Sequence, residues 1–122
     1  MQNNQLTKTE MFDIRQVILS LNDQYVNNKI EGKLIIEDFW PKLGKVILEL
    51  TNNRHYRSII GGVNADILDR NIIKITNKIK QHKEAKAIDD QTKSNISYNE
   101  AELYIGEILR TLDDIFVNIE NV

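Results

Sequence analysis

The sequence of 122 residues contains no cysteine and only one proline, and 7% of its residues are aromatic. The absence of cysteine excludes disulfide bonds, a thiol nucleophile and cysteine-based zinc modules, and it fits a protein of the reducing cytoplasm. No apolar run approaches the roughly 20 residues that a transmembrane helix requires, and the first residues lack the pattern of a secretory signal. With 41% apolar residues, the chain is long enough to bury one core. We therefore expect a single cytoplasmic domain that does not cross a membrane.

Apolar residues recur at alternating spacings of three and four, which is the period of one face of an α-helix. The pattern predicts four amphipathic helices, at about residues 8–27, 38–52, 64–86 and 97–119. Because each apolar stripe must be buried against another, we expect an all-α protein with a compact four-helix bundle. An extra helical turn or two is expected between the second and the third of these helices.

Local signals predict where these helices begin and end. Thr7 and Ser97 each stand three residues before a glutamate, which is the spacing of a capping box, so both are expected as N-caps. Residues 1–6 precede the first cap and are expected to be flexible. The polar stretch before the last helix has no periodicity, so residues 87–96 are expected to form a loop.

The second and third helices have weaker signals. Asp38 and Asn64 are their expected N-caps. Pro41 disfavours helical geometry at Trp40, which is expected either in the core or partly exposed as an anchor for a partner. Gly44 costs about 1 kcal/mol in a helix relative to alanine, which indicates the close approach of a neighbouring backbone.

Charge is distributed unevenly along the chain, whose formal net charge is −2. Residues 54–86 carry 8 basic and 3 acidic residues, whereas residues 87–122 carry 2 basic and 8 acidic residues. Arg70, Lys74 and Lys78 share one face of the third helix and have the spacing to contact phosphates. Because the net charge is negative and no nucleic-acid-binding motif is present, we interpret this face as solvated, and nucleic-acid binding is not expected.

Three carboxylates of the last helix, Glu100, Glu107 and Asp114, recur at spacings of seven residues. Seven residues are nearly two helical turns, so these side chains are expected on one side of the helix. Clustered carboxylates steer the association of a basic partner. This side of the helix is therefore a candidate docking face, although the same pattern is typical of an ordinary solvated surface.

Residue types that carry catalysis are sparse. Neither histidine has the spacing of a metal ligand, so no metal site and no cofactor are expected. The segment 53–57 combines arginine, histidine and tyrosine, but their order does not match that of a helical ribonuclease. We expect Tyr56 to pack on the bundle while Arg54 and Arg57 face water or a partner. No enzymatic activity is expected.

The stretch Tyr25–Leu43 runs from a helix end through Ile30-Glu31-Gly32-Lys33-Leu34 to Phe39-Trp40. This glycine-containing turn between two amphipathic helices resembles the small helical immunity proteins of the colicin D and contact-dependent-inhibition type. The resemblance covers under a fifth of the chain. It implies a protein that binds and occludes a toxin domain, with acidic side chains in place of nucleic-acid phosphates.

We therefore expect a non-catalytic protein-binding inhibitor, of the immunity type or encoded by a bacterium, phage or plasmid. Its expected partner is another protein, such as a basic nuclease or toxin domain. Two alternatives stay open: a helical adaptor or secretion chaperone with an apolar groove, and a nucleic-acid-binding module that uses the third helix. The residues expected to contact the partner are Glu100, Glu107, Asp114, Trp40, Arg54, Tyr56 and Arg57.

Overall fold

The computed structural model describes residues 2–120, with side chains described for residues 9–119. Within residues 2–120 the secondary structure consists of five helices without a strand, so the all-α prediction is confirmed. The predicted count of four is not matched, because the extra helical turns form a helix of seven residues. The helices are α1 (Gln2–Ile30), α2 (Ile36–Asn52), α3 (Arg54–Ile60), α4 (Gly62–Ala87) and α5 (Gln91–Glu120).

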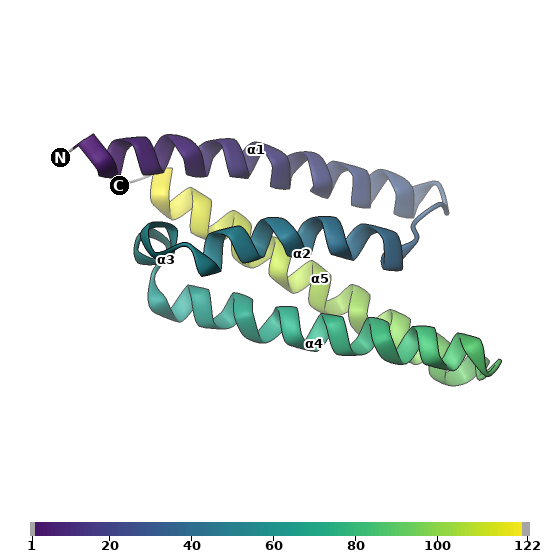
Figure 1. Cartoon of the computed structure of the whole chain (residues 1–122). Coiled ribbons are helices and arrows are strands. Elements are labelled where there is room, and N and C mark those ends of the chain that lie inside the picture. The colour runs from purple at the N-terminus through teal and green to yellow at the C-terminus, as the bar shows by residue number, and fades with distance from the viewer. Residues whose placement is uncertain (1, 121–122) are drawn as a thin grey trace.

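The long helices pack side by side, and α1 begins near where α5 ends (Figure 1). α1 packs along α2, α2 along α4, and α4 most extensively along α5. α5 runs obliquely behind α2 in this view. The backbones of α1 and α5 approach each other much less than those of α4 and α5. This arrangement leaves a long face of both α1 and α5 without a close helical neighbour.

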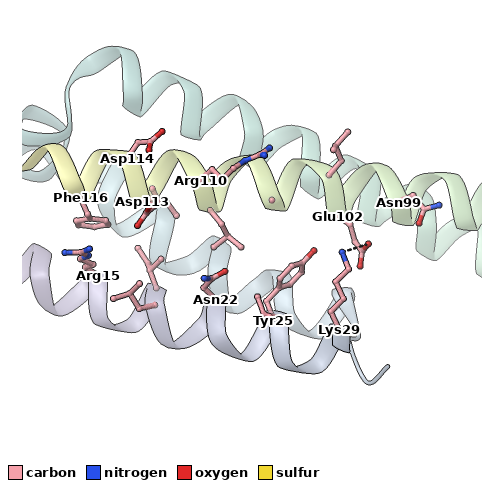
Figure 2. Close-up of a pocket in the computed structure, with 17 residues that line it drawn as sticks. Arg15, Asn22, Tyr25, Lys29, Asn99, Glu102, Arg110, Asp113, Asp114 and Phe116 are labelled. Atoms are coloured by element: carbon pink, nitrogen blue, oxygen red, sulfur yellow. Dashed lines mark ion pairs between the residues drawn. The ribbon is translucent and has the colours of Figure 1, made fainter. Parts of the chain in front are cut away.

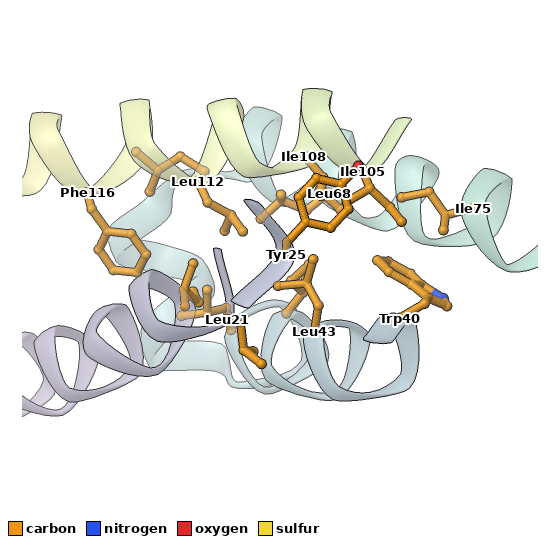
Figure 3. Close-up of a cluster of buried hydrophobic side chains, with 14 of the residues drawn as sticks. Leu21, Tyr25, Trp40, Leu43, Leu68, Ile75, Ile105, Ile108, Leu112 and Phe116 are labelled. Atoms are coloured by element: carbon orange, nitrogen blue, oxygen red, sulfur yellow. The ribbon is translucent and has the colours of Figure 1, made fainter. Parts of the chain in front are cut away.

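One apolar core, to which every helix contributes, holds the five helices together (Figure 3). The predicted stripe of α5 is confirmed, since both Ile108 and Leu112 have no exposed surface. Tyr25 from α1 meets Phe39 from α2, with ring centroids 5.1 Å apart. The largest side chains that are fully buried are Phe116, Met11, Ile36, Leu43, Ile47, Leu50, Leu68, Ile75, Ile105, Ile108 and Leu112.

The ends of α1 and α5 differ from the prediction. α1 already begins at Gln2, so Thr7 lies inside the helix instead of capping it, and residues 2–6 are helical where a flexible segment was expected. Residue 1 lies outside the described residues. The predicted loop at residues 87–96 was wrong as well, because α5 begins at Gln91. Asp90 provides the physical reason, since its Oδ1 accepts a hydrogen bond from the Lys93 amide at 3.1 Å.

The capping predictions for the middle helices were also wrong. α2 begins at Ile36, so Asp38 lies in its first turn, where its charge favours the positive end of the helix. The side chain of Asn64 donates to the Ile60 carbonyl at 2.8 Å, and it therefore binds the end of α3 instead of the start of α4. Gly61 joins these two helices with φ +92°, a conformation that favours glycine.

A neighbouring backbone was expected to lie close to Gly44. The structure instead places a side chain there. A Cβ atom at this position would lie 3.4 Å from two atoms of the Trp40 indole. Trp40 itself is 6% exposed, and its Nε1 donates to Thr76 Oγ1 at 3.2 Å. The indole is therefore part of the core, and the alternative of a partly exposed anchor was wrong.

Candidate protein-binding groove

A groove of about 840 Å³ separates α1 from α5 (Figure 2). It lies where these two helices leave their faces without a close neighbour, and both of its walls are helical. Its floor is formed by the edge of the core, including Ile18, Leu112 and Phe116. The groove is therefore a long, open extension of the apolar core toward solvent.

Apolar side chains on both walls of the groove are accessible. On α1, Leu19 is 38% exposed and Val26 is 44% exposed. On α5, Leu103 is 60% exposed, and Leu109 is half-buried against the core. Single exposed apolar residues are common, but here they face one concave surface. Covering such a surface with another apolar surface is therefore energetically favourable.

Two contacts cross the groove near its two ends. At one end Lys29 Nζ lies 3.6 Å from Glu102 Oε2. At the other end the Arg15 guanidinium lies 6.0 Å from the centre of the Phe116 ring. Both α1 and α5 span 14 residue steps between these contacts, which is about 21 Å along each helix. Between these contacts the two walls are therefore equally long, and they run antiparallel (Figure 2).

Charged residues line both walls of the groove: Arg15 and Lys29 on α1, and Glu102, Arg110, Asp113 and Asp114 on α5. Asp113 and Asp114 are both exposed and form no ion pair with a described residue. In Figure 2 Asp113 points from α5 toward α1, whereas Asp114 points to the other side. Burial, and then the negative charge of Glu102, raise the pKa of Tyr25 to about 12. The groove thus has an apolar floor, and near its Arg15 end the Asp113 carboxylate points toward α1 without an ion-pair partner among the described residues.

Gly106 lies on the α5 wall, between the two ends of the groove. A Cβ atom added to Gly106 would meet no atom within 4 Å. Glycine is unfavourable in a helix interior, and nothing in the folded chain requires its small size here. A larger side chain at position 106 would therefore project into the groove without displacing the core.

The three carboxylates predicted as a docking face do not share one environment. Glu100 Oε2 lies 3.0 Å from Lys78 Nζ, so this carboxylate is directed to α4. Glu107 is half-buried, and only Asp114 lines the groove. The structure adds Asp113, which the spacing of seven did not select.

The predicted contact residues around α3 are mostly engaged within the protein. Tyr56 is 9% exposed and donates to a carboxylate oxygen of Glu10, so its predicted packing on the bundle is confirmed. The Arg57 guanidinium binds Asp66 at 2.8 Å and Asp69 at 3.0 Å. It also donates to the carbonyl of Thr51 at the end of α2. Arg57 thus connects α2, α3 and α4.

Arg54 is exposed, and it is the predicted residue of this segment that stays accessible to a partner. It begins α3, whose N-cap Asn53 accepts hydrogen bonds from the amides of His55 and Tyr56. Arg54 does not line the groove, and neither does any other residue of α3.

The basic stripe of α4 is partly neutralised by α5. Lys78 pairs with Glu100, and Lys74 Nζ lies 5.5 Å from the centre of the Tyr104 ring. Arg70 is exposed and donates to the Asp66 carbonyl at 3.3 Å. Two of the three cations are therefore directed to a neighbouring helix, which disfavours a continuous phosphate-binding face.

A second polar cluster lies where α2, α4 and α5 meet. The His82 ring, 7% exposed, has Nδ1 2.9 Å from the Ser94 carbonyl and 3.0 Å from Ser94 Oγ. Its Nε2 lies 3.5 Å from Glu37 Oε1. These are the residue types of a Ser-His-carboxylate triad. However, a carbonyl oxygen only accepts, so Nδ1 carries a proton and cannot take that of the Ser94 hydroxyl. This cluster links three helices and is not arranged to activate a nucleophile.

The apolar wall residues were missed in the sequence, although one signal points to them. Leu19 and Val26 are seven residues apart, and both lie beside the core stripe of α1. This spacing indicates a second apolar stripe. Together with the core stripe it makes an apolar face that is wider than one neighbouring helix covers. On α5, Leu103 lies outside the core stripe, and the structure places it on the groove wall opposite α1.

Comparisons with protein-family models, with curated proteins and with solved structures gave no match. In the part of the chain that the structure describes, no helix combines the length and apolar character needed to cross a bilayer. Among the same residues, no three metal-ligating side chains come together. The groove is therefore interpreted from its own geometry.

Proposed function

We propose that this protein binds another protein without catalysing a reaction, and that the partner occupies the groove between α1 and α5. The observation that carries this proposal is the set of exposed apolar side chains on both walls of one concave surface. A partner that presents an apolar segment would cover them.

The expected energetics fit specific binding. Complete burial of one leucine side chain contributes about 2 kcal/mol. Leu103 and Val26 are 60% and 44% exposed in the free protein, so much of this contribution would be gained only when a partner buries them. The floor residues are already held by the core, so the partner would meet a preformed surface, which lowers the entropic cost of binding.

An inhibitor of the immunity type is one form of this proposal, in which the bound partner is a toxin or nuclease that loses its activity. An adaptor or secretion chaperone is a second form, and the apolar walls of the groove favour it equally. The two differ in what is bound. An inhibitor binds a folded enzyme and lowers its turnover, whereas a chaperone binds a segment of an unfolded or secreted protein.

Photocrosslinking of the full chain in its host cell tests the proposal. A photoreactive phenylalanine analogue replaces Leu103 on the groove wall or, as a matched control, Ile73 on α4; these residues are 60% and 61% exposed. We expect a crosslink to a different protein from position 103 and none from position 73. The crosslinked protein is then identified, purified and shown to bind the unmodified chain.

Two results would contradict the proposal. Equal crosslinking from both positions would mean that the groove has no special affinity for the captured protein. A crosslink from position 103 to a second copy of this chain would mean that the groove is a self-association surface.

A further inference from the structure

We infer that the element received by the groove is an amphipathic α-helix of about four turns, with a basic residue at the end that lies beside Asp113. This inference rests on the proposed function, since it names the part of the partner that occupies the same groove.

The length of the groove determines the length of the helix. Its end contacts, Lys29 with Glu102 and Arg15 with Phe116, lie about 21 Å apart. A helix rises 5.4 Å per turn, so about 14 residues fill this length. Both walls are themselves helices, and side chains of a third helix can pack between them as ridges in a groove. An extended strand would leave its backbone amides and carbonyls facing helices that have no free backbone partners.

The cross-section of the groove favours an apolar seam on the incoming helix. The walls supply Leu19 and Val26 on one side and Leu103 on the other. A helix with apolar residues at spacings of three and four can contact both sides with one face. Gly106 leaves open space between the ends of the groove, where a large apolar side chain of the partner fits.

The charges of the rim favour a basic residue at one end. Arg15 and Lys29 on the α1 wall already lie against Phe116 and Glu102. Asp113 has no ion-pair partner among the described residues, and it points toward α1. An incoming apolar or acidic end would leave this carboxylate partly desolvated and unpaired, which is unfavourable. A lysine or arginine at this point compensates its charge.

Synthetic helical peptides of about 15 residues with one common leucine seam test the inference. One peptide carries two lysines at its N-terminal end, the second carries them at its C-terminal end, and the third carries glutamates at both ends. Their affinity for the full chain is measured by fluorescence anisotropy. We expect one of the lysine peptides to bind about tenfold more tightly than the glutamate peptide.

Variants of the full chain then locate the contact. Asp113→Lys is expected to remove the preference for the lysine peptide, whereas Glu84→Lys, the same charge change at an exposed site on α4, leaves it intact. Gly106→Trp fills the groove and is expected to abolish binding of every peptide. Circular dichroism verifies that each variant folds.

The outcomes separate this inference from the proposed function. If all three peptides bind equally and Gly106→Trp still blocks them, the partner does not need a basic residue beside Asp113, although the groove remains the binding site. Absence of binding by any peptide, or binding that Gly106→Trp does not change, would overturn the helical occupant. In either case, crosslinking from position 103 still decides whether the groove binds a protein at all.

Discussion

Replacing Gly106 with alanine is expected to stabilise the protein, even though this residue lines the proposed binding site. Glycine in a helix interior costs about 1 kcal/mol relative to alanine. An added Cβ meets no atom within 4 Å, so no steric cost opposes this gain. The unfolding entropy is about 0.26 kcal/mol per kelvin for a chain of this length, so the melting temperature should rise by about 4 °C.

Gly44→Ala serves as the matched control, because it has the same change in helix propensity but a different environment. Its Cβ would lie 3.4 Å from the Trp40 indole, so we expect a smaller gain or a loss. Thermal unfolding followed by circular dichroism measures both variants. If Gly106→Ala lowers the melting temperature, or if both variants behave alike, position 106 does not face open space and the groove is not as described.

Three further predictions concern the fold. Leu112→Ala should lower the free energy of unfolding by about 2 to 5 kcal/mol in urea denaturation, because Leu112 is fully buried; a loss near zero would show that α5 packs differently. Asn53→Ala should cost about 1 kcal/mol by the same assay, because its side chain caps α3, whereas Asn53→Asp should retain most of the stability. The hydrogen bond to Glu10 raises the pKa of Tyr56 to about 12, and burial raises that of Tyr25 to about 12. Both are neutral in the folded state below pH 10, so their contribution to stability should be lost as the pH rises from 10 through 12. Tyrosinate absorbance that appears near pH 10 for all tyrosines would contradict this.

The helices were predictable from the sequence because each stripe repeats over several turns. Ile108 and Leu112 follow this period, and both are fully buried. Helix ends were not predictable, because they depend on single contacts. Ser94 stands in a polar stretch without periodicity and Ser97 was expected as an N-cap, but both are buried within α5. Ser94 lies against His82 of α4, and no local signal reveals a partner 12 residues away.

The candidate site was much less predictable than the fold. An apolar stripe shows that a helix face is buried but not which helix covers it. The separation of α1 from α5 therefore does not follow from the sequence of either helix. The spacing of seven selected Glu100 and Asp114 together. The structure separates them, because the Lys78 side chain binds Glu100 from α4 while Asp114 lines the groove. Trp40 illustrates the same limit, since its indole donates a hydrogen bond to Thr76, 36 residues away in the sequence.

The affinity of the crosslinked partner for two variants at one position tests the central claim most directly. Gly106→Ala and Gly106→Trp both add a side chain to the α5 wall, but only tryptophan is large enough to fill the groove. Titration calorimetry with the purified partner should give nearly the wild-type Kd for Gly106→Ala and at least about a hundredfold weaker binding for Gly106→Trp, which is about 2.7 kcal/mol. Wild-type affinity for a correctly folded Gly106→Trp variant would contradict the account, because the partner would then bind elsewhere on the molecule.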